Sequence, residues 1–286
     1  MSNIRKLRKK IKSIKQTQQI TKAMKMIATV RLYRAQNNIL NSRPFAIKMY
    51  QMMNNILNTL ENIPENVRNF FISTENKKIG ILLITSDRGL CGSYNNNLIN
   101  KAIEFINFNK ERPVFFIVGK KGRDYFLKSD YAIEKEYINI FNNLCYAHAE
   151  IISNDILEYF LNKRITDLFI VYSEFKSILK QEFIIKQLLP IKPEEIQNNI
   201  HSEFIFEPQK EILLETLVPR YIKSQIYRVL LESLASELAS RMTSMDQASK
   251  NAQELINSLT LEMNKVRQSL ITTQILDIIG TKEAIK

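Results

Sequence analysis

The chain has 286 residues, with six glycines, seven prolines and no tryptophan, and it is long enough for one or two domains with a sizeable core. Its net charge is +12, and the sequence contains no apolar run of about 18 residues that could span a membrane. Two isolated cysteines, Cys91 and Cys145, indicate a reducing compartment. These features exclude a membrane-spanning protein and a disulfide-stabilised secreted domain.

All of the excess positive charge lies in the first segment of the chain. Residues 1–60 hold thirteen lysines and arginines and no acidic residue, whereas residues 61–286 hold 28 basic and 29 acidic residues. This basic start lacks the apolar core of a signal peptide, so we expect the protein in the cytosol. A helix of one charge sign repels itself, which favours an acidic partner such as nucleic acid, anionic lipid or an acidic protein surface. A solvated helix face is the plainer alternative.

The first 43 residues contain no glycine or proline and predict a long helix. Apolar or small side chains recur on average every 3.5 residues, which is the coiled-coil period, and Gln18 and Thr21 interrupt the stripe with polar groups. Pro44 either kinks this helix or starts a second one over residues 46–61. The predicted stripe consists of Ile4, Leu7, Ile11, Ile14, Gln18, Thr21, Met24, Ala28, Leu32, Ala35 and Ile39.

Strands and helices are predicted to alternate between residues 78 and 206. Residues 79–85 form an unbroken apolar run, which is typical of a strand covered on both faces, and a turn at residues 86–92 follows it. Such an alternation favours a small doubly wound parallel sheet. The other predicted elements are strands at 113–118 and 167–172, helices at 93–108, 121–128 and 147–162, and edge strands at 183–189 and 203–206.

A second long helix is predicted from Arg220 to Gly280, where the glycine would end it. At a rise of 1.5 Å per residue it would be roughly 90 Å long, so it needs an equally long partner. The fold class we expect is therefore a long antiparallel coiled coil of the N- and C-terminal helices, with an inserted Rossmann-like doubly wound α/β domain. The coiled-coil shaft would take residues 1–77 and 207–286, and the inserted domain residues 78–206. The predicted stripe of the second helix consists of Tyr227, Leu231, Leu234, Leu238, Met242, Met245, Ala248, Ala252, Leu255, Leu259, Met263, Val266 and Leu270.

No motif in the chain carries convincing chemistry. The turn with Gly89 and Gly92 lies between a strand and a helix, where a phosphate could sit, but it lacks the third glycine of a dinucleotide fingerprint and the lysine of a P-loop. Cys91 could act as a nucleophile only with a base, and no motif places His148 or His201 beside it. No metal-ligand spacing occurs either. We therefore expect no catalytic, cofactor or metal site, with a nucleotide-binding enzyme built on this turn as the weaker alternative.

Several specific segments resemble the gamma subunit of the F-type ATP synthase, bacterial type, and together they cover essentially the full length. They match its N-terminal helix, its first strand–turn–helix and its C-terminal helix. The segments are ITKAMKMIA at residues 20–28, RAQ at 34–36, TSDRGLCGSYN at 85–95, ESLASE at 232–237, SRM at 240–242, ASKNA at 248–252, NKVRQ at 264–268 and IT at 271–272.

The resemblance implies a non-catalytic rotor subunit in the central stalk of a proton-translocating ATP synthase. Such a subunit transmits rotation of the membrane c ring to the alpha3beta3 ring, where ATP is made, and it regulates ATPase activity. The implied partners are the alpha and beta subunits, the epsilon subunit and the c ring. The implied location is the cytoplasmic side of the bacterial inner membrane, where the complex binds the protein peripherally. No cofactor is implied.

The resemblance also implies where the shaft meets the beta subunits. Met24 matches a methionine close to an acidic loop of a beta subunit, and the charges of Lys22 and Lys25 suit that loop. Members of the family often carry glutamate at the position of Lys25. Arg267 and Gln268 match a pair that hydrogen-bonds a second loop of a beta subunit.

Two further regions follow from the resemblance. The segment with Phe206 and Glu207 resembles the part of the family near the c ring and the epsilon subunit, and residues 275–279 would run unpaired into an apolar collar of the ring. The alternative function is a basic coiled-coil nucleic-acid-binding protein that uses the N-terminal arm. Tyr33 is the only aromatic residue in the first forty residues, which is against nucleic-acid binding.

Overall fold

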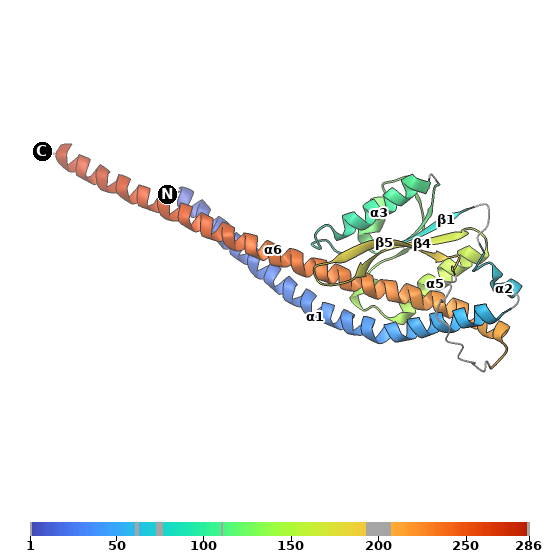
Figure 1. Ribbon diagram of the computed structural model, residues 1–286. Coiled ribbons are helices and arrows are strands. Elements are labelled where there is room, and N and C mark those ends of the chain that lie inside the picture. The colour runs from blue at the N-terminus through green and yellow to red at the C-terminus, as the bar shows by residue number, and fades with distance from the viewer. Residues whose placement is uncertain (1, 61–62, 73–76, 110, 193–206, 285–286) are drawn as a thin grey trace. The chain divides into compact units, whose positions relative to one another are not determined.

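A computed structural model describes residues 2–60, 63–72, 77–109, 111–192 and 207–284, so the strand expected at 203–206 lies outside the described residues (Figure 1). Two very long helices begin and end the chain, and a sheet with shorter helices lies between them in the sequence. The helices are α1 (Ser2–Thr59), α2 (Glu65–Arg68), α3 (Tyr94–Asn109), α4 (Lys120–Phe126), α5 (Tyr146–Leu161) and α6 (Lys210–Ala284). The strands are β1 (Ile79–Ile84), β2 (Val114–Val118), β3 (Ala132–Tyr137), β4 (Asp167–Phe175) and β5 (Gln181–Leu189).

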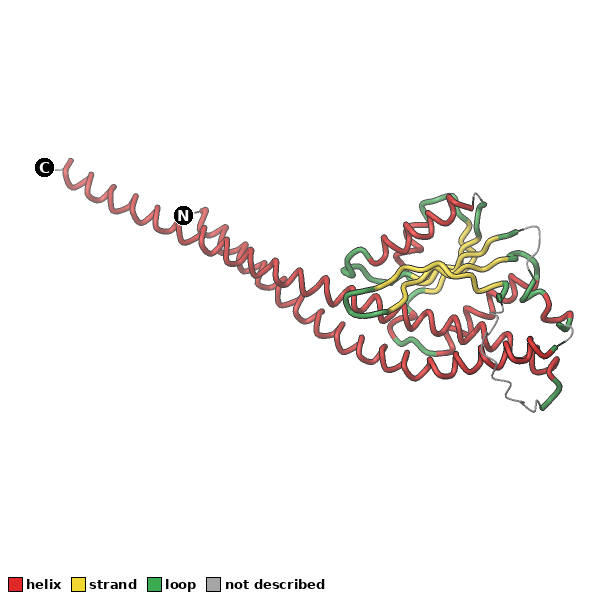
Figure 2. Tube along the Cα trace, in the orientation of Figure 1, coloured by secondary structure: helices red, strands yellow, loops and turns green. Residues whose placement is uncertain are grey.

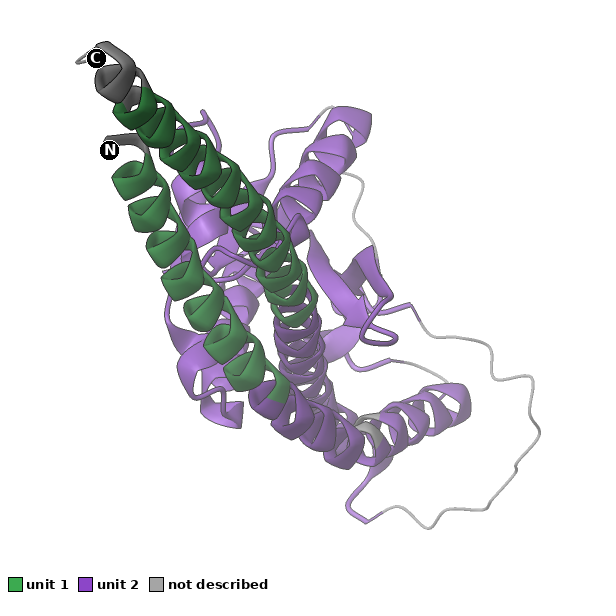
Figure 3. Cartoon of the chain, turned by 90° about the vertical axis from the view of Figure 1, so that its left-hand side faces the viewer, with its two compact units in different colours: residues 1–29, 241–286 green, residues 30–240 purple. Residues whose placement is uncertain are grey.

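The chain divides into two compact units, coloured separately in Figure 3. The two-helix unit contains residues 1–29 and 241–286, and the sheet unit contains residues 30–240. Each long helix therefore contributes one part to each unit. The expected combination of paired terminal helices and an inserted α/β domain is confirmed.

The sheet has five strands in the order β3-β2-β1-β4-β5. Figure 2 draws its strands in yellow. The first four run parallel, and β5 pairs antiparallel with β4. The sheet is thus mixed, whereas the sequence favoured a parallel sheet. Strand β3, with the sequence AIEKEY, was not predicted, because it lies mostly exposed at an edge and has no apolar run.

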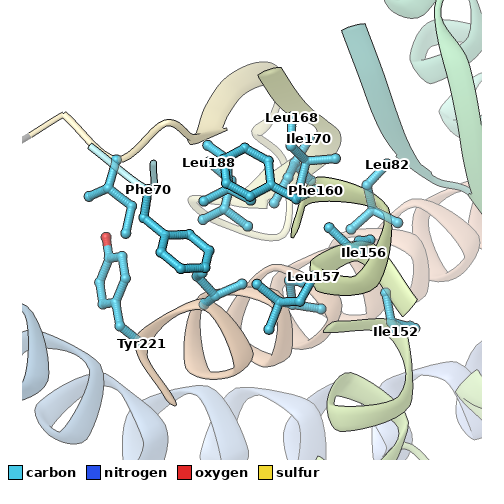
Figure 4. Close-up of a cluster of buried hydrophobic side chains, with 14 of the residues drawn as sticks. Phe70, Leu82, Ile152, Ile156, Leu157, Phe160, Leu168, Ile170, Leu188 and Tyr221 are labelled. Atoms are coloured by element: carbon cyan, nitrogen blue, oxygen red, sulfur yellow. The ribbon is translucent and has the colours of Figure 1, made fainter. Parts of the chain in front are cut away.

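Alternate side chains of β1 enter two separate cores, because successive residues of a strand point to opposite faces. Leu82 and Ile84 pack into a large cluster with α5 and with parts of α1, α2 and α6, whereas Ile81 and Leu83 pack against α3 and α4. Figure 4 shows the first cluster, in which Phe70 stacks on Phe160 with ring centroids 5.3 Å apart. Helices on both faces confirm the doubly wound arrangement.

Two predicted helix boundaries are wrong, both of them on α6. Helix α6 begins at Lys210 rather than Arg220, so that Pro219 lies inside it. Helix α1 runs through Pro44 to Thr59 as one helix, which excludes the separate second helix but not the alternative in which the first helix continues. Helix α6 also continues through Gly280 to Ala284. A glycine inside a helix costs only about 1 kcal/mol relative to alanine, and lysine, glutamate and alanine, which follow here, are good helix formers.

Candidate functional site

The two-helix unit is the part of the molecule on which the expected site residues lie, and its helices pair antiparallel. Gln18 on α1 contacts Gln253 on α6, and Lys25 contacts Asp246, so residue numbers rise on one helix as they fall on the other. An apolar cluster holds the pair together toward the start of α1. Its buried members are Ile11, Ile256 and Leu259, and Leu7, Ile14 and Met263 pack against them.

The seam on α1 follows the predicted stripe. Within the two-helix unit, Ile11, Thr21 and Ala28 are buried, and the other predicted positions from Ile4 to Met24 are partly buried. The predicted stripe continues in the sheet unit, where Leu32, Ala35 and Ile39 are buried as well.

On α6 the predicted seam is wrong at one clear position. Leu255 is 54% exposed, whereas its neighbour Ile256 is 6% exposed and belongs to the apolar cluster. The buried positions of this part of α6 are Met245, Ser249, Ala252, Ile256 and Leu259, which alternate in steps of four and three residues. This is the heptad pattern of a coiled coil.

Polar side chains fill the seam where the stripe was predicted to weaken. The side-chain amide of Gln18 donates to Gln253 Oε1 at 2.9 Å and to the Ser249 carbonyl at 3.3 Å. The Thr21 hydroxyl donates to the Gln18 carbonyl at 3.0 Å. The side-chain amide N–H of Gln18 and the hydroxyl of Thr21 therefore both have an acceptor, as donors at a partly buried seam should.

Asp246 lies between two lysines next to this polar section. Lys25 Nζ is 2.6 Å from Asp246 Oδ1, and Lys250 Nζ is 3.1 Å from Asp246 Oδ2. The hydrogen bond from Lys25, then that from Lys250, holds the pKa of the Asp246 carboxyl below its ordinary value. Lys25 thus pairs with its own chain, a contact that sequence reasoning did not find.

The structure places the expected site residues at two positions that are far apart along the helix pair. Lys22 is exposed and Met24 half-buried at the level of Asp246, whereas Arg267 and Gln268 are exposed much further along α6. The 21 residues from 246 to 267 correspond to ~32 Å of helix at 1.5 Å per residue. The two groups therefore cannot form one site. Glu207 is exposed in the sheet unit, and Phe206 lies outside the described residues.

The last part of α6 extends past the start of α1. With Gln18 opposite Gln253 and α1 beginning at Ser2, residues beyond about 270 have no α1 residue opposite them. Large apolar side chains are nevertheless exposed there, between 48% and 68%. They are Ile271, Ile275, Leu276, Ile278 and Ile279.

The glycine turn after β1 is held by internal hydrogen bonds. Asp87 Oδ1 accepts from the backbone N–H of Lys120 at 3.2 Å and of Asn139 at 2.9 Å. Asn95 Oδ1 accepts from the Ser86 N–H at 2.9 Å, and Ser240 of α6 donates to the Cys91 carbonyl at 2.7 Å. The turn thus fastens the loops at this sheet edge and joins them to α6, which is a structural task.

The two cysteines lie in different surroundings. Cys91 is buried, and Asn95 Nδ2 lies 3.2 Å from its sulfur. Cys145 is exposed, and its sulfur lies 3.1 Å from Nδ1 of His148 at the start of α5. No group of three or more histidine, cysteine or acidic side chains that could hold a metal occurs among the described residues.

Comparisons with known proteins identify the family. The family model described as ATP synthase matches residues 3–285. The chain is 38% identical over 290 residues to the ATP synthase gamma chain of Geobacter sp. (strain M21), and 39% identical over 293 residues to that of Geotalea daltonii, with all of each chain covered. The chain belongs to the ATP synthase gamma chain family. It is a non-catalytic subunit of an F-type ATP synthase and forms the rotor of its central stalk.

Solved structures share the gamma-chain fold. A chain of the Euglena gracilis mitochondrial ATP synthase, in a structure of OSCP, F1 and c-ring, has a TM-score of 0.70 at 20% identity, covering 99% of this chain and 95% of that one. A chain of the Tetrahymena thermophila enzyme, in a structure of the central stalk and c-ring, has a TM-score of 0.62 at 25% identity. That match covers 80% of this chain and 99% of the other. Among the described residues, no helix has an apolar stretch long enough to cross a membrane.

Proposed function

We propose that this gamma chain transmits rotation of a membrane c ring to an alpha3beta3 ring and so drives ATP synthesis from proton flow. The observation that carries the proposal is the two-helix unit, with its apolar seam inside and its lysines and arginines outside. Such a surface can favour different beta-subunit conformations as it turns, because a ligand shifts an equilibrium by its differential affinity for the two states. The solved relatives come from structures of central stalk, F1 and c-ring, which supports these partners.

The contacts with the beta subunits would lie at two levels of α1 and α6. At the level of Asp246, Met24 and Lys22 would face an acidic loop of a beta subunit, with Lys25 beside them, because positive charge at this level suits an acidic surface. Nearer the end of α6, Arg267 and Gln268 would hydrogen-bond a second loop of a beta subunit, since the side chains of both are exposed. The separation of ~32 Å along the helix lets one subunit touch two loops of the ring.

The exposed end of α6 fits an apolar collar in the ring. Its side chains from Ile271 to Ile279 are large and exposed, and exposed apolar side chains gathered on one element mark an interaction surface. A loose apolar contact without directional bonds would let the helix turn while staying centred. These residues would therefore keep the end of α6 centred in the ring while the helix rotates.

The segment before α6 would meet the c ring and the epsilon subunit. Glu207, together with Phe206, precedes α6 in the segment assigned to these contacts. This position would give the protein a peripheral place on the cytoplasmic side of a bacterial inner membrane, and contact with epsilon would let it regulate ATPase activity.

We also propose that the functional division of the chain differs from its two compact units. Residues 1–77 and 207–286 would act as the shaft, and residues 78–206 as the Rossmann-like domain that rests beside the membrane ring. The sheet unit includes α1 and α6 segments because they cover one face of the sheet. Packing and mechanical task thus group these segments differently.

The proposal is tested by replacing Arg267 with alanine in the assembled complex. We expect ATP synthesis to fall by a factor of about 10 to 150, since a hydrogen bond to a charged group is worth ~1.5–3 kcal/mol, while the thermal unfolding temperature stays unchanged. Lys265→Ala is the matched control, because Lys265 is also exposed on α6 and has no assigned contact.

Three results would count against this proposal. Purification without alpha, beta and epsilon subunits would contradict the assembly. An equal loss of stability and synthesis in Arg267→Ala would contradict the contact. Binding of DNA that weakens steeply with salt would favour the nucleic-acid alternative.

A further inference from the structure

The seam between α1 and α6 changes character for about two turns. From Gln18 to Lys25 no large apolar side chain of α1 is buried, because the seam positions are Gln18, Thr21 and Met24. Opposite them on α6 lie Asp246, Ser249 and Gln253, next to the buried side chains of Met245 and Ala252. We call these contacts, from Gln18–Gln253 to Lys25–Asp246, the polar clasp.

We propose that Lys25 is a positioning residue of the rotor, which fixes the register of α1 against α6 through Asp246 rather than binding the beta subunit itself. This inference rests on the proposed rotor function and refines the role of one residue assigned to the beta contact. Lys22 and Met24 would then be the residues of this part of α1 that contact the ring. Lys25 would fix their position along and around the axis of the helix pair.

The ammonium group of Lys25 is paired within its own chain. Its ammonium group lies 2.6 Å from Asp246 Oδ1, and Lys250 occupies the other oxygen of the same carboxylate at 3.1 Å. Lys22 differs, because no ion pair of Lys22 occurs within the described residues and its side chain is exposed. Two lysines three residues apart on one helix therefore have different tasks.

The clasp is suited to setting register and contributes little to stability. An apolar seam with a heptad repeat can slide by one repeat and still bury similar side chains, whereas a directional polar pair fits at one register only. The Lys25 and Asp246 side chains are 43% and 34% exposed, and an ion pair so exposed adds little to folding. A shaft that carries torque needs this fixed register, because slippage between its helices would dissipate the rotation.

The test is a charge swap in the assembled, membrane-bound complex. Lys25→Glu and Asp246→Lys each place like charges together, so each should reduce ATP made per proton transported about two- to fivefold, the range expected for one exposed ion pair. The double variant Lys25→Glu/Asp246→Lys restores an opposite pair and should recover the ratio. Lys15→Glu, on an exposed residue of the same helix, is the matched control for the charge change and should leave the ratio unchanged.

Each other outcome overturns the inference. If the singles reduce the ratio and the double variant is no better, Lys25 acts on the ring. If the singles leave the ratio unchanged, the clasp has no mechanical role. If the singles lose much more thermal stability than an exposed ion pair contributes, and the coupling ratio falls with it, the pair only supports folding. Failure of the rotor proposal is separate, because Arg267→Ala would then leave synthesis unchanged whatever the swap does.

Discussion

Helix α6 is one continuous helix with two kinds of surroundings. In the sheet unit, residues 221–239 are buried at almost every position, because the sheet, α5 and α1 surround that part. In the two-helix unit, large apolar side chains of the same helix are buried only at heptad positions such as Met245 and Ile256 among the described residues. The first part is a core helix and the second is half of a coiled coil.

This difference separates the tasks of the two regions. A helix enclosed on all sides is fixed by packing, and many neighbours resist any change there. A helix held along one narrow seam keeps most of its surface free for partners, but its register depends on few contacts. The exposed half can therefore carry function, while the enclosed half provides the anchorage.

The largest expected loss of unfolding free energy comes from a substitution in the sheet unit. Leu230 is fully buried there, and Leu230→Ala should destabilise that unit by about 2–5 kcal/mol. Leu259→Ala in the two-helix seam should cost less, about 1–2 kcal/mol, because water and neighbouring side chains can fill the space. Hydrogen exchange measured separately in the two units of the purified chain would compare them. Equal losses would contradict the contrast.

A smaller effect sharpens the position of the seam. Ile256 is buried and its neighbour Leu255 is exposed, so Ile256→Ala should cost about 1–2 kcal/mol, whereas Leu255→Ala should stay within about 0.5 kcal/mol. The two variants remove similar side chains at adjacent positions, so each controls the other. A larger loss of unfolding free energy in Leu255→Ala than in Ile256→Ala would support the seam position predicted from the sequence, with Leu255 inside.

The smallest expected effect is a change in how stability depends on pH when Asp246 is replaced. The pKa of Asp246 is lowered by the hydrogen bonds from Lys25 and Lys250. A lowered pKa means that the pair contributes stability above the ordinary carboxyl pKa and loses it as the pH falls through the folded value. Asp246→Asn should therefore be slightly less stable than the parent at neutral pH, and the difference should vanish in acid. Thermal unfolding against pH would measure it, and a difference that grows in acid would contradict the pairing.

The sequence predicted the architecture because the two long helices carry their own patterns. The stripe on α1 was right at every described position, since regular spacing without glycine leaves little choice. The stripe on α6 failed at Leu255, because adjacent apolar residues Leu255 and Ile256 cannot be ranked by hydropathy alone.

The predicted boundaries at Pro219 and Gly280 failed because α6 continues through both residues, and at Pro44 the first helix continues as one of the two predicted options allowed. The packing of α6 in the sheet unit, where Val218 and Ile222 are buried on either side of Pro219, outweighs the cost of a proline there.

The site was predictable only in part. Family motifs pointed to Lys22, Met24, Lys25, Arg267 and Gln268, and their roles remain proposals. The Lys25–Asp246 pair joins residues 221 positions apart, so no local pattern could reveal it. The contact between Cys145 and His148 was missed for another reason, since a cysteine three residues before a histidine is no motif by itself.

The central claim is that the two helices turn as one rigid shaft whose surface, rather than any reactive group, does the work. It is tested most directly by linking them covalently. Gln18→Cys/Gln253→Cys, in a chain with Cys145→Ser, would be joined in the assembled complex by a short, reducible thiol-specific linker. We expect ATP synthesis to match that of the single-cysteine controls treated alike. Synthesis lost on linking and regained on reduction would show that the helices must move against each other, and would contradict the account.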